Sequence, residues 1–450
     1  MISTRNRIPR APLSAALLAL IVLAARSASA NPYELFGFTP RAIGLSDAVV
    51  AVPDDLSAIF YNPAAMVGHT KTEFGLGFED TLSNLYINRA PGTASQPAST
   101  IDSSMPDNVP RIEFGLIFPL GGAVLKDRVA IGFTFGTPLG SLIKVQTVDQ
   151  SKPQFYMYQS KPQRFAAALS AGIKIVDGLS IGIGAQVIAE QIASVDFAID
   201  LAARRFDARN IDVALNTEIK PFVGILVQPN DWISIGFSWR DESELYYTQP
   251  TTLDLGDIGK LVLNVAGYAQ YWPHVFSLGT SLKPTSRLLL SFQLDYLLWS
   301  SAPNDQVYVQ ISPSGPVLDG LGLSSILGFS SNDAPMGFQN IFIPRVGIEY
   351  VATDWLAVRG GAYVRPAITP DQTGTTNYLD NFTENFSAGA TLKFEDPLHI
   401  FTEAVHLDLS MALMVANERD TVKSQAIDAT GNYSYGGTLF SFGAMLRYLY

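Results

Sequence analysis

Apolar and polar residues alternate along most of the chain after residue 71. Between residues 288 and 298 a large apolar residue occupies every second position, and polar residues such as Ser291 and Asp295 lie between them. Residues 233–240 and 405–415 repeat the pattern. A period of two places successive side chains on opposite faces of a strand. The pattern therefore predicts a chain made almost entirely of β-strands.

Fourteen segments show this alternation. Several exceed the length of about 9–11 residues that a tilted strand needs to cross a bilayer. Their predicted ranges are 72–88, 109–119, 129–138, 162–175, 179–194, 211–227, 232–244, 270–283, 287–301, 341–351, 355–366, 383–395, 403–416 and 437–450.

The links between these segments alternate between short and long. The short links are residues 121–128, 176–178, 229–231, 284–286, 353–354 and 396–402, and the long ones are 89–108, 139–161, 195–210, 245–269, 302–340, 367–382 and 417–436. Outer-membrane barrels have short periplasmic turns and longer extracellular loops, whereas a soluble sandwich has no reason to keep every second loop short. We predict an all-β fold, a transmembrane antiparallel β-barrel of about 14 strands over residues 72–450.

The first thirty residues have the features of an export signal. Arg5, Arg7 and Arg10 precede an apolar stretch over residues 11–25, and residues 28–30 read Ala-Ser-Ala, as in a cleavage site. Because a helix needs about 20 apolar residues to span a bilayer, this stretch is too short for an anchor. We predict a signal peptide over residues 1–30 and a location in the outer membrane of a Gram-negative bacterium.

Composition narrows the functional classes. Charged residues make up 16% of the chain and the mean hydropathy is +0.18, yet no stretch beyond the leader has 18 consecutive apolar residues. The net charge of −11 argues against nucleic acid as a partner. The chain has no cysteine, and its four histidines form no metal-binding doublet such as H-E-x-x-H. We expect no enzyme activity, no cofactor and no metal.

Residues 44–66 do not alternate like a strand. This segment is apolar, rich in small residues and interrupted by two prolines. A short helical piece ahead of a long run of strands suggests a plug in front of a barrel. We predict that residues 31–71 form a small helical hatch that closes the lumen.

The hatch has recognisable helix boundaries. Ser46 is predicted to cap a short helix over residues 47–52, and Asp54 a second turn through residues 56–61. Asn62 is a third N-cap, with Pro63 at the first helical position, where its missing N–H carries no penalty.

The residues from Asp54 to Ala64 resemble the N-terminal hatch of the FadL/TodX family of outer-membrane transporters for hydrophobic compounds. Asn62, Pro63 and Ala64 match the Asn-Pro-Ala motif of that family residue by residue. The resemblance implies passive diffusion of a fatty acid or hydrocarbon, with Asn62, Pro63, Ala64, Phe60, Asp54 and Asp55 as hatch and gating residues.

The same resemblance implies a route for the ligand. In the family the ligand is caught by extracellular loops, passes to a site above the hatch and leaves sideways through a kink in the third strand. Here Gly132, Gly136 and Pro138 would permit such a kink, because glycine and proline weaken a ladder.

Two long loops are unusually apolar, over residues 253–265 and 317–329. In the first, Leu261, Leu263 and Val265 are the predicted residues of initial ligand capture. The alternative is that the two loops form helices that pack on each other, and both interpretations can hold together.

Several charges point away from the apolar face of their strands, among them Arg345, Arg359 and Arg365. One hypothesis is that such charges are solvated or pair with the plug, where Asp54 and Asp55 are natural partners. The other is that an arginine receives the carboxylate of a ligand, which would favour fatty acids over hydrocarbons. The sequence does not decide between them.

The expected partners are a hydrophobic small molecule, outer-membrane lipid and the barrel-assembly machinery. The last would recognise the C-terminal strand, which ends on the aromatic Tyr450, and we expect a monomer. Two alternatives remain open: a related barrel that acts as a protein-binding shuttle or anchor in secretion, and an open diffusion porin.

Overall fold

The computed structural model describes most of the chain. The described residues are 33–53, 55–95, 105–121, 127–140, 152–158, 165–200, 205–255, 259–303, 308–322, 329–330, 336–396, 403–425 and 430–450. The predicted signal peptide and Asp54 lie outside them. No helix in these ranges is long and apolar enough to cross a membrane, a finding that does not bear on spanning by strands.

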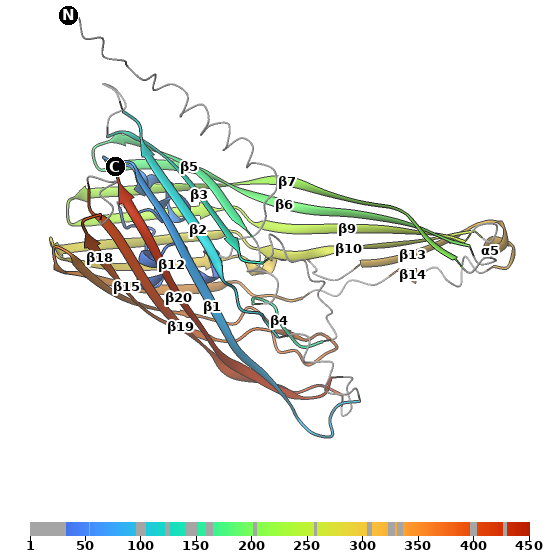
Figure 1. The fold of residues 1–450 in the computed structure, drawn as a ribbon. Coiled ribbons are helices and arrows are strands. Elements are labelled where there is room, and N and C mark those ends of the chain that lie inside the picture. The colour runs from blue at the N-terminus through green and yellow to red at the C-terminus, as the bar shows by residue number, and fades with distance from the viewer. Residues whose placement is uncertain are drawn as a thin grey trace, which may run out of the picture.

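Fourteen strands pair in an antiparallel ring, which confirms the predicted barrel (Figure 1). The first and last strands close the ring along seventeen paired residues, from Glu73 with Leu449 to Arg89 with Tyr433. The strands of the ring are β1 (Glu73–Arg89), β2 (Arg111–Pro119), β3 (Val129–Pro138), β5 (Ala166–Val176), β6 (Leu179–Asp200), β7 (Arg205–Asn230), β8 (Ile233–Arg240), β11 (Val275–Thr285), β12 (Leu288–Leu297), β15 (Ile341–Thr353), β16 (Leu356–Arg365), β18 (Thr383–Phe394), β19 (Val405–Thr421) and β20 (Tyr433–Leu449).

The alternation of the sequence separates the two faces of this wall. On β12, Phe292 is exposed on the outer surface, whereas its neighbours Ser291 and Gln293 are buried in the lumen. Arg359 and Asp408 are likewise buried on the inner side. The ring therefore presents an apolar band outward, where only lipid can cover it, and keeps its charges inside.

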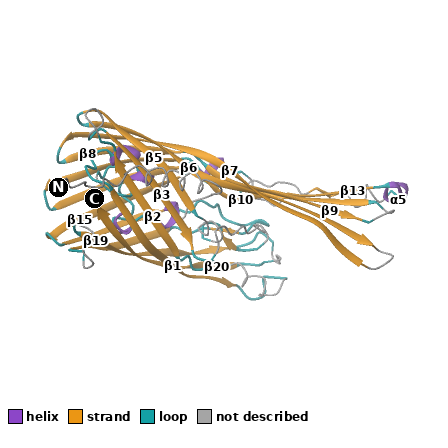
Figure 2. Cartoon of the chain, turned by 45° about the horizontal axis from the view of Figure 1, so that its top comes forward, coloured by secondary structure: helices purple, strands orange, loops and turns teal. Residues whose placement is uncertain are grey.

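Three of the long connections build an arm in place of loops (Figures 1 and 2). We use this name for the outer parts of β6 and β7 together with β9 (Ser243–Asp254), β10 (Lys260–Trp272), β13 (Tyr308–Ser314) and β14 (Phe329–Ser330). β9 lies parallel to β6 and antiparallel to β10, and β10 pairs with β13. The short helix α5 (Pro316–Gly320) lies near the tip. The arm leaves the barrel at the end opposite the short turns.

The arm corrects the expected secondary structure of two loops. The described residues 253–255 and 259–265 do not form a helix, because they belong to the β9–β10 hairpin. Leu261, Leu263 and Val265 occupy alternate positions of β10, a strand pattern that the apolar character of the segment obscures. In the described part of the second loop, helix is confined to residues 317–320, the last four residues of α5.

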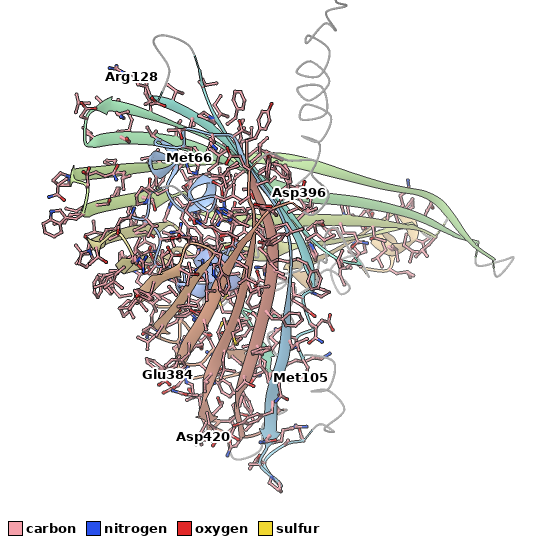
Figure 3. The ribbon with its side chains drawn as sticks, turned by 60° about the vertical axis from the view of Figure 1, so that its left-hand side comes forward. Met66, Met105, Arg128, Glu384, Asp396 and Asp420 are labelled. Carbon is pink, nitrogen blue, oxygen red and sulfur yellow. The ribbon has the colours of Figure 1, made fainter. Side chains whose placement is uncertain are left out.

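The hatch lies inside the ring, toward the short turns, as Met66 shows in Figure 3. Its helices are α2 (Tyr33–Phe36), α3 (Pro40–Gly44), α4 (Ala58–Tyr61) and the 3₁₀ turn η1 (Pro63–Met66). The predicted helix over residues 47–52 is wrong. Ser46 and Asp47 have φ of 53° and 59°, left-handed values that end α3 instead of starting a new helix. The Asn62 cap is confirmed, since its side chain accepts a hydrogen bond from Ala64 N.

A second set of chain segments fills the lumen above the hatch. β4 (Gln154–Phe155) and β17 (Tyr378–Leu379) form a two-residue parallel ladder, and η5 (Trp299–Ser301) lies against it through the contact of Trp299 with Tyr156. We call β4, the following residues 156–158 and β17 the roof. The hatch and the roof thus enclose a space between them in the middle of the lumen.

The arm is dispensable for closing the ring, because β8 pairs directly with β11 from Arg240 with Val275 to Ile233 with Leu282. We expect that replacing residues 248–266 with an Asn-Gly turn, which can connect the paired Tyr247 and Gly267, leaves a folded barrel. The folded form should still migrate faster than the heated form on a detergent gel. Loss of that folded band would show that the ring depends on the arm.

Candidate functional site

The hatch backbone lies directly against the barrel wall at glycines. A Cβ at Gly224 would lie 2.0 Å from Asn62 Oδ1, and one at Gly236 only 2.1 Å from the Val50 carbonyl oxygen. At Gly182 it would be 2.4 Å from Ala64 N. No side chain fits in such a space, so glycine is required for this close approach.

These positions form a belt around the wall at the level of the hatch. Gly182 pairs with Gly224, and Gly236 pairs with Gly279, so the small residues are adjacent across strands. We call this set the glycine belt; its members are Gly75, Gly115, Gly132, Gly136, Gly172, Gly182, Gly224, Gly236, Gly279, Gly347 and Gly361.

Two residues predicted for a kink in the third strand belong to this belt. Gly132 makes room for Met66 and Ile59, and Gly136 makes room for the Tyr33 ring. β3 pairs with β2 up to Pro138 and with β5 up to Gly136, with no register shift in either ladder. The structure thus uses these glycines for hatch contact, and a lateral opening at β3 stays a prediction.

Asn62 holds two hatch segments and the wall together. Its amide donates to the carbonyl oxygens of Val50 (2.7 Å) and Ile225 (3.1 Å), while its oxygen accepts from Ala64 N (3.1 Å). The side chain is fully buried. Each of these polar groups would otherwise lie unpaired away from water, which is costly.

The other predicted hatch residues lie against the same wall. Pro63 and Ala64 face the glycines of β5 and β6, where no side chain intervenes. Phe60 is buried beneath the Arg240 guanidinium, whose carbon lies 3.6 Å from the ring centroid. The same guanidinium donates a hydrogen bond to the Phe60 carbonyl oxygen.

Asp55 pairs within the hatch. Arg41 Nη1 lies 2.5 Å from Asp55, and Arg41 Nη2 lies 2.8 Å from Glu349 of β15. Burial works to raise the pKa of Asp55, yet the Arg41 guanidinium holds that pKa below its usual range. Arg41 therefore joins the hatch to the wall by ion pairs on both sides.

The ion pairs continue from Glu349 around the lumen below the hatch. Arg359 lies 3.2 Å from Glu349 and 3.5 Å from Asp408, and Arg447 bonds both Asp408 and Glu73. A buried chain of alternating charges that crosses several strands costs much if one member is removed. Arg359 is thus a structural partner within this chain and does not face the cavity described next.

A cavity of about 60 Å³ lies between hatch and roof. Its floor is the hatch, with Asp47, Val50, Phe60 and Tyr61. Its ceiling is aromatic and apolar, with Met157 and Tyr158 of the roof beside Trp272 and Trp299. The inner face of the wall contributes polar, charged and apolar side chains, among them Arg240, Ser277, Gln293, Asp295, Arg345, Tyr363, Arg365 and Met414.

Two of the three predicted lumenal arginines line this cavity, and both are paired. Arg345 Nε donates to Asp295 at 2.6 Å, and its Nη1 lies 3.6 Å from Asp47. Arg365 makes a bidentate pair with Asp380, with both distances 2.8 Å. These arginines are paired mainly with carboxylates outside the plug, Asp295 and Asp380, whereas the expected plug partner Asp55 pairs with Arg41.

Arg240 is a cavity residue that the sequence analysis missed. Its Nη1 lies 3.3 Å from Glu34 of the hatch. Trp272, Trp299 and Tyr363 were missed too, because the alternation marks a residue as inward without saying which inward residues meet at one height. The predicted capture residues on β10 lie in the arm and do not contribute to the cavity.

A known protein family matches nearly the whole chain, from before the hatch to the last strand. Residues 21–446 match the family described as outer membrane protein transport protein (OMPP1/FadL/TodX). The chain belongs to this family. Membership places it in the outer membrane of Gram-negative bacteria and among transport proteins, not enzymes.

Individual relatives are distant in sequence. Alkane uptake protein A of Marinobacter nauticus is 22% identical over 431 residues, which cover 90% of this chain and 88% of that protein. A FadL homologue of Pseudomonas aeruginosa has a TM-score of 0.58 at 17% identity, covering 90% of this chain and 97% of the other. The toluene transporter TodX of P. putida gives 0.57 at 11%, covering 92% and 99%. These structures show a shared fold.

The glycine belt can be tested with a matched pair of substitutions. Gly224→Ala places a methyl group against Asn62, whereas Gly360→Ala meets its nearest atom at 3.6 Å. We expect Gly224→Ala to lower the free energy of unfolding by about 1–3 kcal/mol, as overpacking does, and to make the hatch more susceptible to protease. Gly360→Ala should match the parent in both measurements. Equal behaviour of the two variants would contradict the role of the belt.

Proposed function

We propose that this barrel takes up uncharged hydrophobic small molecules by passive diffusion through the cavity between hatch and roof. The observation that carries the proposal is a cavity with an aromatic ceiling in which each lining arginine already faces a protein carboxylate. The alkane and toluene proteins among its relatives are named for uncharged ligands, which supports this choice.

The charges of the cavity disfavour a fatty acid. Glu34, Asp47 and Asp295 line it together with their arginine partners. Asp295 is held by three donors, from Arg345, Ser277 and Gln293, at 2.6–2.7 Å. A ligand carboxylate would have to displace such a partner or remain unpaired near other carboxylates, and a buried unpaired charge is costly.

The hatch sets the direction in which the ligand leaves. Backbone contact at the glycine belt and the ion pairs of Arg41 hold the floor of the cavity against the wall. A path downward requires these contacts to break, whereas a path sideways requires only a local parting of wall strands. We therefore favour lateral release into the outer-membrane lipid, with the hatch acting as the gate that keeps the floor closed.

The same contacts weigh against an open porin, because the hatch fills the lumen at the level of the belt. A porin would conduct ions across a planar bilayer without any deletion. This barrel should conduct little until residues 42–68 are removed. The hypothesis of a protein-binding shuttle predicts co-purification of a partner.

Ligand charge can be tested by changing one carboxylate. Asp295→Asn leaves Arg345 with the more distant Asp47 as its carboxylate partner. We expect the parent protein to take up radiolabelled hexadecane and to bind hexadecanoate weakly. Asp295→Asn should bind hexadecanoate about tenfold better, the worth of one charge-assisted hydrogen bond, with hexadecane uptake little changed. Tight hexadecanoate binding by the parent protein would contradict an uncharged ligand.

The hatch can be tested at Asn62. Asn62→Ala removes three hydrogen bonds and should lower the free energy of unfolding of the hatch by about 1–3 kcal/mol. Hexadecane uptake should become slower because Val50 and Phe60, which form the floor of the cavity, lose their fixed position, while membrane insertion persists. Asn340→Ala, at an exposed rim asparagine, is the matched control. Parent-like uptake by Asn62→Ala would remove its assigned role.

A further inference from the structure

The roof closes the cavity on the side away from the hatch. Tyr156 of the roof and the adjoining Trp299 of η5 are almost fully buried. The Tyr156 ring contacts Phe338, Tyr378 and Trp299 with centroid distances of 4.7, 5.9 and 6.0 Å. A ligand that comes from outside the cell therefore meets a packed aromatic layer before it reaches the cavity.

The β17 side of the roof is bound to the barrel wall at many points. Asn381 donates its amide to the carbonyl oxygens of Asn417 (2.8 Å) and Tyr435 (3.2 Å). Asp380 forms the bidentate pair with Arg365 of β16 and also accepts from Ile368 N at 2.8 Å. This half of the roof is part of the rigid wall.

The β4 side reaches the cavity and rests on the β17 side. Gln154 N donates to Asn377 O and Tyr156 N to Leu379 O, both at 3.1 Å. Tyr158 accepts a hydrogen bond from Arg365 Nη2 at 2.9 Å. Met157, which directly precedes Tyr158, lines the cavity together with it.

One guanidinium thus bonds both halves of the roof. When Tyr158 leaves Arg365, the bidentate pair with Asp380 remains, so no buried charge loses its partner. The ladder between β4 and β17 has only two residues, whereas neighbouring strands of the ring pair over seven or more. Fewer backbone hydrogen bonds therefore hold β4 than hold any strand of the ring, and its side chains are held mainly by packing, such as Phe155 against Tyr435 of β20.

We propose that residues 154–158 form the extracellular gate of the cavity, with the hydrogen bond between Arg365 and Tyr158 as its latch. Met157 and Tyr158 are then the residues that select what enters, because they are the gate residues that line the cavity. The proposal rests on the proposed function, in which an uncharged ligand crosses this cavity.

A reversible cross-link tests the gate. Gln154 and Tyr378 are directly paired in the ladder, and strands lie about 4.8 Å apart, within the range that a disulfide spans. Because the chain has no cysteine, Gln154→Cys with Tyr378→Cys introduces a single bridge. We expect oxidation to reduce hexadecane uptake at least about tenfold, the change that 1.4 kcal/mol of barrier would give, and dithiothreitol to restore it.

The control bridge is Phe292→Cys with Val346→Cys, two paired residues on the outer face of the wall. It should leave uptake unchanged when oxidised. Equal uptake by the oxidised and reduced forms of the roof bridge would overturn the gate.

The latch is tested by a readout that needs no ligand. Met157→Cys places a buried thiol in the gate, and its rate of reaction with a maleimide reports opening. Adding Tyr158→Phe removes the hydrogen bond to Arg365, and we expect labelling about tenfold faster, the worth of one hydrogen bond to a charged group. A thiol at the buried Met445 of β20, Met445→Cys, should label at the same rate with or without Tyr158→Phe.

The two readouts separate the two proposals. If Tyr158→Phe speeds labelling but the protein takes up no hexadecane, the result supports the gate and contradicts the proposed ligand. If Tyr158→Phe does not change the labelling rate, and hexadecane uptake is the same with the roof bridge oxidised or reduced, the gate is contradicted but the transport function is not.

Discussion

The fold depends on one constraint: a ring of fourteen strands is too wide to be filled by its own side chains and needs a second object inside it. Here that object is the hatch, and it fits because the wall has glycine where the two come into contact. At Gly182, Gly224 and Gly236, hatch atoms occupy the place where a Cβ would stand. Backbone polar groups of the hatch then lie next to the wall, where Asn62 satisfies two carbonyl oxygens at once. Because this contact fixes the floor, the cavity above it has a defined shape.

Electrostatics divides the lumen into levels. Below the hatch, Arg41, Glu349, Arg359 and Asp408 form a continuous chain of paired charges that binds the plug to the wall. At the level of the cavity the pairs are separate, and each arginine has its own carboxylate. Burial raises the pKa of Asp47, against the attraction of the Arg345 guanidinium. A space with an aromatic ceiling, whose arginines are already paired with protein carboxylates, suits a ligand without charge.

The sequence predicts the ring well because period-two alternation and alternating loop lengths are local signals. Every predicted membrane strand has its counterpart, and the Asn62 cap is where its pattern places it. Prediction failed where distant contacts decide. The helix expected after Ser46 does not form: α3 ends at Gly44, and the chain turns at Ser46 to lie along Gly347 and Gly361. The hairpin at Leu261 and Leu263 was hidden because β10 gains its partners from β9 and β13, far from the lipid. The cavity is lined by residues from the hatch, the roof and several strands, and no local sequence pattern predicts that these distant residues lie together.

The glycine belt also sets a condition on how the molecule is assembled. With hatch atoms closer to the wall than any side chain allows, the plug has no clearance to slide into a finished ring. It must be enclosed while the strands are still joining. The chain is arranged for this order: the hatch runs directly into β1, and the seam that β1 makes with β20 includes Glu73 beside Arg447, a pair that continues the ion pairs below the plug. β20 thus completes two things at once: the cylinder, through its pairing with β1, and the chain of charges beneath the hatch, through Arg447.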